Sequence, residues 1–318
     1  MSGFVLRGRG LDPYENLAVE EALLGFVKPD DCVLYLWQND KTVVIGKNQN
    51  PWKECRLPVL EAEGVRLARR PSGGGAVYHD RGNLNFSFVA GSGVYDTARQ
   101  NFVIEDALRA LGLRCERLGR NDFLLDGRKF SGQAYYQRKN AACHHGTLMV
   151  DVDLDMASRC LTPPKAKLEA KGVDSVRSRV VNLRECSPAL TVETLEQAIT
   201  DAFGKTLYPT TALLTQDALD RRLIRRLTER NRSEDWRLGT RFPADLQFEG
   251  HFGWGQIELA LQLSGQTVTA CRVHTDAMDE TLAETIEAAL TGTRFSVDAL
   301  EERLRPLPEG EDILRMLR

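Results

Sequence analysis

Apolar residues along the chain follow two spacings, one typical of helices and one typical of strands. Residues 13–27 carry apolar side chains at helical spacing, after a capping Asp12 and a first-turn Pro13. The same spacing recurs over residues 103–111 and 191–203. Short or alternating apolar runs predict strands, which are expected at 33–37, 42–46, 76–78, 84–88, 123–125, 129–132 and 146–154.

Turn sequences between these segments predict hairpins. Residues 38–41 separate the strand at 33–37 from the strand at 42–46, and Asp80-Arg-Gly-Asn83 separates 76–78 from 84–88. Asp126-Gly127 separates 123–125 from 129–132, and Asp-Gly is among the strongest short hairpin signals. We therefore expect each of these strand pairs to be antiparallel neighbours.

A strongly charged stretch with a helical pattern, at about 215–235, separates two regions of the chain that differ in composition. The region after it is rich in aromatic residues, then alternates as strands at 257–263 and 268–273 joined by a Ser-Gly-Gln turn, and ends in helices near 282–290 and 297–304. This pattern predicts a small α+β module. We place the domains at residues 1–235 and 236–318.

Composition narrows the class of protein. With 318 residues, 42% apolar and 27% charged, the chain is typical of a soluble globular protein of about two domains. A net charge of -3 argues against nonspecific nucleic-acid binding. Seven cysteines without a Cys-x-x-Cys pair indicate a reducing compartment. Since no signal peptide or membrane span is evident, we expect a cytoplasmic protein.

The stretch Arg69–Phe88 contains three consecutive glycines, Gly73–Gly75, which allow positive φ and close approach of a ligand to the backbone. Arg69 and Arg70 precede the glycines and Ser72 supplies a hydroxyl, so the expected ligand is an anion such as phosphate or carboxylate. The spacing fits neither the Walker A loop nor the dinucleotide fingerprint, because the first requires Gly-Lys-Ser/Thr and the second requires a helix directly after the loop.

A second group of polar residues surrounds Lys129, which follows the Asp-Gly turn and precedes a Ser-Gly pair. A fixed ammonium there could neutralise charge on a carboxyl or phosphate oxygen. Adjacent His144 and His145 point to opposite faces of a strand, which argues against a shared zinc ion. Cys143 is interpreted as a buried filler. A site that contains several cationic side chains and an anion-binding backbone, but no obvious nucleophile, suits the activation of a carboxylate by a nucleotide.

Several motifs, in order, resemble the lipoate-protein ligase A family. They are Arg69-Arg-Pro-Ser-Gly-Gly-Gly-Ala-Val-Tyr-His-Asp80, Gly119-Arg-Asn-Asp122, Arg128-Lys-Phe-Ser-Gly-Gln-Ala134, His144-His-Gly-Thr-Leu148 and Lys171-Gly-Val-Asp-Ser-Val-Arg-Ser-Arg-Val-Val-Asn-Leu183. The resemblance covers the chain to about residue 190 and, more loosely, the tail from about 236. It implies the α+β, mixed-sheet fold of the biotin and lipoate protein ligases with a small accessory domain.

The resemblance also implies a two-step reaction. Lipoate and ATP, with Mg²⁺ expected beside the nucleotide, give lipoyl-adenylate and pyrophosphate, and an acceptor lysine then attacks the adenylate. The implied catalytic residue is Lys129. The implied ATP and adenylate contacts are Arg70, Gly75, Ala76, Val77, Tyr78, Asn121, Asp122 and Lys129. The implied lipoate contacts are Ser72, Gly73, Gly74, Asn83, Lys129, Ser131, His145 and Gly146, with apolar side chains expected around the lipoyl tail.

The implied acceptors are lipoyl domains of 2-oxoacid dehydrogenase E2 subunits and the glycine cleavage H protein, and the enzyme is expected to be a monomer without nucleic-acid or membrane partners. A transferase of the same fold that uses a preformed acyl donor without ATP remains an alternative. So does a module that binds lipoate or biotin without turnover. The sequence does not distinguish lipoate from octanoate and does not identify metal ligands.

Overall fold

The computed structural model describes residues 2–8, 10–119, 121–162 and 180–318. The motif at 171–183 and the basic segment from Lys165 therefore lie largely outside the described residues, as does Arg120.

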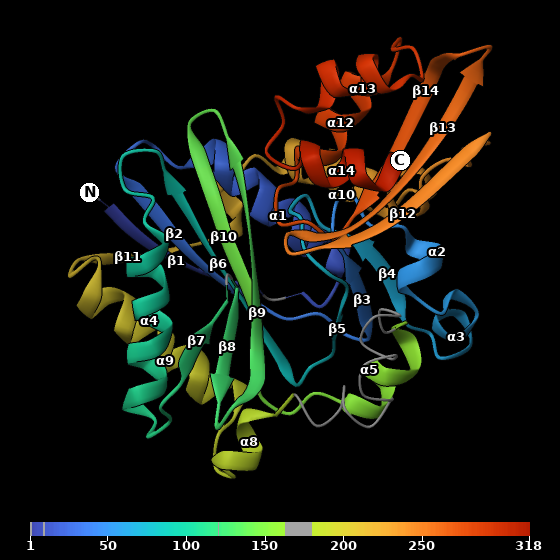
Figure 1. Cartoon of the computed structure of the whole chain (residues 1–318). Helices are drawn as coiled ribbons and strands as arrows, with labels where there is room; N and C mark the ends of the chain where they lie inside the picture. The colour runs from blue at the N-terminus through green and yellow to red at the C-terminus, as the bar shows by residue number, and fades with distance from the viewer. Residues whose placement is uncertain (1, 9, 120, 163–179) are drawn as a thin grey trace.

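The larger part of the molecule is built on an eight-stranded sheet in the order β11-β1-β2-β6-β10-β9-β8-β7 (Figure 1). Its strands are β1 (Ser2–Arg7), β2 (Asp31–Trp37), β6 (Asn83–Gly91), β7 (Glu116–Leu118), β8 (Asp122–Leu125), β9 (Arg128–Arg138), β10 (Ala141–Met149) and β11 (Thr211–Leu214).

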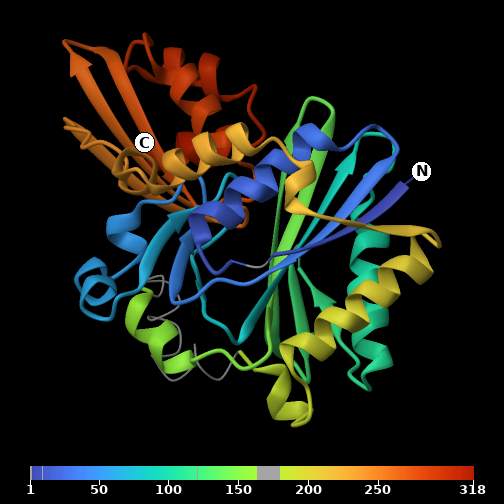
Figure 2. The same ribbon diagram turned by 180° about the vertical axis from the view of Figure 1, so that it is seen from behind.

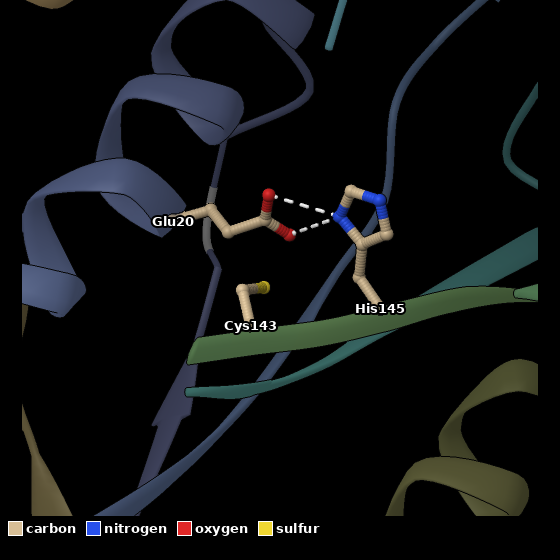
Figure 3. A group of neighbouring side chains, drawn as sticks. All are labelled: Glu20, Cys143 and His145. Carbon is tan, nitrogen blue, oxygen red and sulfur yellow. Dashed lines mark hydrogen bonds and ion pairs between the residues drawn. The ribbon is translucent and has the colours of Figure 1, made fainter. Parts of the chain in front are cut away.

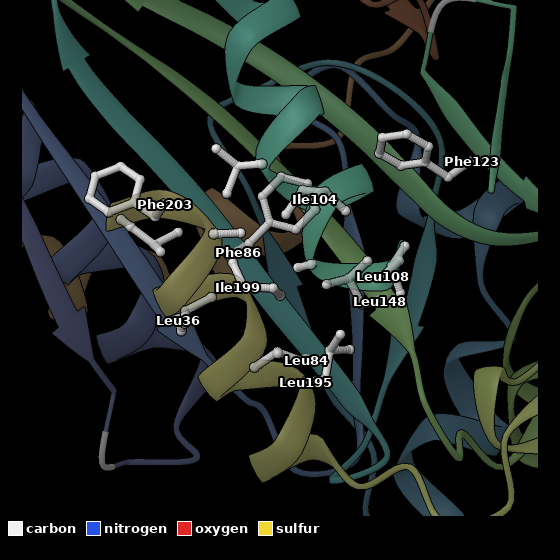
Figure 4. Packing of buried hydrophobic residues seen from close by; sticks show 14 of the residues in the cluster. Leu36, Leu84, Phe86, Ile104, Leu108, Phe123, Leu148, Leu195, Ile199 and Phe203 are labelled. Carbon is white, nitrogen blue, oxygen red and sulfur yellow. The ribbon is translucent and has the colours of Figure 1, made fainter. Parts of the chain in front are cut away.

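This sheet is mixed: β1 runs parallel to β2 and β11, whereas the other neighbouring strands pair antiparallel. Two helices, α4 (Thr97–Ala110) and α9 (Val192–Thr206), cover one face, and apolar residues such as Ile104, Ile199 and Phe203 pack there against Phe86 of β6 (Figure 4). Two others, α1 (Pro13–Phe26) and α10 (Arg221–Arg232), run side by side across the opposite face (Figure 2).

A second sheet of three strands has the order β4-β3-β5 and comprises β3 (Thr42–Ile45), β4 (Arg66–Arg69) and β5 (Val77–His79). Short helices lie beside it: α2 (Pro51–Glu54), α3 (Leu57–Ala62) and α5 (Leu154–Cys160). Two predicted hairpins are therefore wrong. The strand after residues 38–41 and the strand before residues 80–83 pair with each other, as β3 and β5, and not with β2 and β6.

Local signals were reliable elsewhere. Asp126 and Gly127 both have positive φ, 51° and 73°, and join β8 to β9 as predicted. The helices expected near 13–27, 103–111 and 191–203 are α1, α4 and α9. The strand expected at 146–154 is shifted, because β10 begins at Ala141 and ends at Met149. A short helix, α8 (Leu183–Cys186), follows the 163–179 segment.

The accessory part begins after the charged stretch. It contains the antiparallel strands β12 (Leu246–Phe252), β13 (Gly255–Ser264) and β14 (Thr267–Thr275), covered by α12 (Leu282–Leu290), α13 (Val297–Leu304) and α14 (Gly310–Leu317) around a separate apolar core. The strands and the first two helices agree with the predicted α+β module, whereas α14 was not expected. The boundary at residue 235 remains a prediction.

The charged stretch forms a 3₁₀ turn, η1 (Gln216–Ala218), then α10 and α11 (Glu234–Leu238). Part of its positive charge is neutralised, because Arg221, Arg230 and Arg232 pair with acidic residues. Arg222, Arg225 and Arg226 are exposed, and we call them the exposed α10 arginines. No helix in the described part of the chain is both long and apolar enough to cross a bilayer.

Candidate active site

A pocket of about 590 Å³ lies where the two sheets meet the accessory part. Ten of the predicted site residues line it: Arg70, Gly74, Gly75, Ala76, Val77, Asn121, Asp122, Lys129, His145 and Gly146. Five others lie outside this lining: Ser72, Gly73, Tyr78, Asn83 and Ser131. The fold therefore brings the glycine loop and the Lys129 strand, which are far apart in sequence, to a common pocket.

The three glycines differ in what approaches them. A Cβ atom at Gly73 would overlap the carbonyl oxygens of Ala277 and Met278 from the accessory part, and the Gly74 N–H donates to the Ala277 carbonyl at 3.0 Å. Gly74 also has a positive φ of 86°. Gly75 is exposed and has open space beside it. The first two glycines therefore receive the accessory part, and Gly75 faces the pocket.

Arg70 shapes this loop from within the protein. Its buried guanidinium donates to the carbonyls of Gly73 at 2.7 Å and Gly75 at 2.8 Å, to Val44, and to the Ser72 hydroxyl at 3.0 Å. Burial lowers the pKa of Arg70 to about 10. Since no carboxylate among the described residues forms a salt bridge with it, this cation on the pocket wall favours an anionic ligand.

Arg69 has a different position from the one expected. Its guanidinium donates to carbonyls of the loop after β3, at Gly46, Lys47 and Gln49, and to carbonyls of α11, at Trp236 and Arg237. It does not line the pocket. Arg69 thus joins α11, which leads to the accessory part, to the loop after β3, and it is not placed to bind an anion in this pocket.

A buried hydrogen-bond chain supports the glycine loop from the opposite side. Glu20 of α1 accepts a hydrogen bond from His145 Nδ1 at 2.9 Å (Figure 3). On the other side of the ring, His145 Nε2 lies 2.8 Å from the Ser72 hydroxyl. Burial acts to raise the pKa of Glu20, but His145 and the hydroxyls of Ser87 and Tyr136 outweigh it and hold that pKa below its usual value. The chain therefore orients Ser72, and through it Arg70.

Potential metal-ligating atoms of Glu20, His145 and Cys143 lie within 4.8 Å of one another, a spacing that one ion could bridge. Glu20 already accepts hydrogen bonds from Ser87, Tyr136 and His145. Burial raises the pKa of the Cys143 thiol well above its usual value, which disfavours the thiolate that binds metals. The donor set therefore fits a hydrogen-bond network and not a metal ion.

The neighbouring histidine faces the other way, as predicted. His144 packs between Phe86 and Tyr135, and its two ring nitrogens face Gln100 and Gln133 at 3.0 and 3.2 Å. Burial lowers its pKa to about 3, so the ring is neutral at ordinary pH. His144 is a core residue of the sheet.

Lys129 lines the same pocket as Gly74 and Gly75. Its ammonium contacts a carboxylate oxygen of Asp122 at 2.7 Å, and 38% of its side chain is exposed. The side-chain amide of Asn121 donates to the Gln133 carbonyl at 3.1 Å and holds the end of β8 against β9. An accessible ammonium on the wall of a pocket can stabilise negative charge that develops on a ligand bound there.

The pocket also contains residues that sequence analysis did not predict. Leu17, Trp37 and Val44, beside the predicted Val77, supply apolar side chains of the kind expected around an uncharged tail, and polar His79 and Asn85 line the same pocket. Trp37 is fixed by a 3.0 Å hydrogen bond from its indole N–H to Ser87. Glu20 was also missed, although an acidic residue on the apolar side of a predicted helix is an available signal. The accessory part contributes Phe252, Trp254, Asp276 and Met278.

Comparison with known proteins places this pocket in context. Residues 12–204 match the family described as lipoyl protein ligase A/B catalytic domain, and residues 242–315 match the bacterial lipoate protein ligase C-terminus. The P. falciparum LipL1 structure in complex with lipoate is 26% identical and superposes with a TM-score of 0.87, covering 100% of this chain and 98% of that one.

Two further structures cover the catalytic part. One comes from a structural analysis of a bi-partite lipoate protein ligase and its E2 lipoyl domain from Thermoplasma acidophilum, at 31% identity and TM-score 0.67, covering 77% of this chain and 100% of that one. The other is lipoate-protein ligase A bound with ATP, at 29% identity and TM-score 0.64, covering 75% and 99%. With both family regions matched in order, this chain belongs to the lipoate-protein ligases.

Proposed function

We propose that this enzyme activates lipoate with ATP and transfers the lipoyl group to a lysine of a lipoyl domain. In the first step a lipoate carboxylate oxygen attacks the α-phosphorus of ATP and pyrophosphate leaves. In the second step the lysine amine attacks the acyl carbon of lipoyl-adenylate, AMP leaves and the amine loses a proton. The main support is that Lys129 and the Gly75–Val77 segment line one pocket together with the apolar side chains of Leu17, Trp37 and Val44.

The proposed roles follow from position. Gly75, which has open space beside it, and the adjacent Ala76 and Val77 would contact the nucleotide, and the buried charge of Arg70 would favour its phosphate while holding the loop in shape. Lys129 would leave Asp122 to neutralise the oxygens that join acyl group and phosphate. Trp37 and its apolar neighbours would enclose the lipoyl tail.

The pocket also fits magnesium brought with ATP as a substrate ion. Carboxylates of Asp122 and Asp276 lie on its wall, and Mg²⁺ in nucleotide sites is commonly held by one or two carboxylates together with phosphates. When bound there, the ion would neutralise phosphate charge. This chain's own contribution is to orient the two substrates and to exclude water around them.

The main alternative is a transferase of the same fold that takes its acyl group from a preformed donor. Among the described residues no cysteine lines the pocket, and Cys143 is fully buried behind it. A covalent route through a thiol therefore lacks a nucleophile in this arrangement. We expect lipoyl domains of 2-oxoacid dehydrogenase E2 subunits and the glycine cleavage H protein to be the acceptors, in line with the E2 lipoyl domain that is named with the Thermoplasma ligase.

The intact mass of a lipoyl domain tests this function. Incubation with the enzyme, lipoate and MgATP should add one lipoyl group, and omission of either small molecule should abolish the modification. Replacing the acceptor lysine by arginine is the control for site specificity. Modification by an acylated carrier protein without ATP, and none with lipoate and ATP, would support the transferase instead.

A further inference from the structure

One polar side chain of the pocket wall lacks a hydrogen-bond partner. His79 of β5 lines the pocket and is only 3% exposed, and its ring packs edge to face against Trp37. Its Nε2 atom is buried and has no partner among the described residues. The other buried side-chain atoms of the described chain that lack partners belong to residues outside the pocket lining. Because buried polar groups are normally paired, this atom is available to a ligand.

Neighbouring amides determine which ring nitrogen of His79 carries the proton. Asn16 Nδ2 lies 3.2 and 2.8 Å from the backbone carbonyls of Gly10 and Gln38, which can only accept, so this end of the amide is the amino group. Asn16 Nδ2 also donates to Asn39 Oδ1 at 3.0 Å. Asn39 therefore presents its own amino group to His79 Nδ1, at 3.1 Å, and that ring nitrogen accepts.

The ring of His79 is neutral at ordinary pH. Burial lowers its pKa to about 3, and the positive charge of Arg70 acts in the same direction. A neutral imidazole has one N–H donor and one acceptor nitrogen. Since Nδ1 accepts from Asn39, the proton is on Nε2, and the unpaired atom is a donor. A single buried N–H thus belongs to a pocket that also contains apolar side chains.

We propose that His79 determines substrate specificity by donating this N–H to an acceptor atom in the tail of the acyl substrate. This role rests on the proposed function and adds which medium-chain acids the pocket prefers. The dithiolane ring of lipoate carries sulfur atoms, which are weak acceptors, whereas the alkyl tail of octanoate has none. An alkyl tail would displace water from the donor and leave it unpaired, which weakens binding. Lipoate should therefore bind more tightly than octanoate.

Two acids that differ by one ketone group test the donor directly. In 6-oxooctanoate a ketone oxygen, which is a stronger acceptor than sulfur, is attached to the carbon that carries a sulfur atom in lipoate. An apolar wall alone would disfavour this oxygen relative to octanoate, whereas an unpaired N–H would favour it. Dissociation constants of lipoate, 6-oxooctanoate and octanoate are measured by calorimetry without ATP, so the comparison does not depend on adenylate formation.

Three variants accompany the wild-type enzyme. His79→Leu removes the donor, and His79→Gln keeps an amide donor at a similar distance from the backbone. His144→Gln is the matched control, because His144 is also buried and neutral but both of its ring nitrogens have partners and it does not line the pocket. Wild type should bind 6-oxooctanoate about tenfold more tightly than octanoate, and lipoate should also bind more tightly than octanoate. Both preferences should disappear in His79→Leu and persist in the other two variants.

Wild-type enzyme that binds octanoate as tightly as 6-oxooctanoate would overturn the proposal, whether or not any variant folds. An unchanged preference in His79→Leu would also overturn it, because another group would then supply the donor. Loss of the preference in His144→Gln as well would mean that packing, and not the N–H of His79, sets the specificity. The predicted order of binding without any lipoate-dependent pyrophosphate release would contradict the ligase function and leave the role of His79 in binding intact.

Discussion

Replacement of Lys129 by alanine should separate catalysis from stability. The Lys129–Asp122 pair is partly open to solvent, with 38% and 30% of the two side chains exposed, so its loss should lower the free energy of unfolding by about 1 kcal/mol or less. The same ammonium faces the pocket, where loss of one preorganised charge contact typically slows a reaction about 100-fold to 1000-fold. That rate loss corresponds to roughly 3 to 4 kcal/mol of transition-state stabilisation.

The rate of adenylate formation and the thermal unfolding curve are measured on the same preparation. Lys205→Ala is the matched control, because Lys205 also pairs with an aspartate, Asp106, but is 78% exposed and does not line the pocket. Both variants should unfold within a few degrees of wild type, and Lys129→Ala alone should lose adenylate formation. Near-normal adenylate formation by Lys129→Ala would refute the proposed role of its charge.

Three other predictions concern the fold and its parts. Burial lowers the pKa of His144 from its ordinary 6.5 to about 3, so between these values the unfolded chain binds the proton and the folded chain does not. The free energy of unfolding should therefore fall as the pH decreases below 6.5, by on the order of 1 kcal/mol per pH unit. In denaturant unfolding, His144→Gln should show a smaller change in this free energy with pH. Gly73→Ala should displace the accessory part, because a methyl group there overlaps the Ala277 carbonyl, and small-angle scattering should show the change. Replacing the exposed α10 arginines with glutamine should slow lipoyl transfer at low salt and flatten its salt dependence, while adenylate formation is unchanged.

Each of these has a result that would count against it. Parallel pH–stability curves for wild type and His144→Gln would mean that another group causes the acid sensitivity. Superimposable scattering profiles for wild type and Gly73→Ala would show that the contact with the accessory part tolerates a side chain. Transfer kinetics that do not change across a salt series would reduce the exposed α10 arginines to a solvated helix face.

Structural features that depend on adjacent residues were predicted correctly, whereas features that depend on distant residues were not. The Asp126-Gly127 turn fixes its own hairpin, and capped helices such as α1 follow from adjacent residues. The pairing of β3 with β5 was missed because a turn sequence marks a reversal of the chain without naming the partner strand. Alternating apolar and polar residues, as in β6, are typical of a strand with one buried face, yet the whole of β6 is buried.

The site was predictable in its glycine loop and Lys129 and not in the groups that support them. Glu20 and His145 are 125 residues apart and meet across a helix and a sheet, so no local pattern connects them. The three glycines were interpreted as an anion-binding loop, yet Gly73 and Gly74 contact the accessory part, which lies about two hundred residues later in the chain. Close approach of any backbone requires the same absence of a Cβ atom.

Pyrophosphate release from ATP, measured with and without lipoate and in the absence of any acceptor, tests the proposed activation step most directly. A burst of pyrophosphate of about one equivalent per enzyme should appear only with lipoate, because the adenylate stays in the pocket when no lysine is available. Lipoyl-adenylate should be recovered from the same sample. Lipoyl transfer that proceeds from a preformed donor, with no lipoate-dependent pyrophosphate release, would contradict ATP-dependent activation.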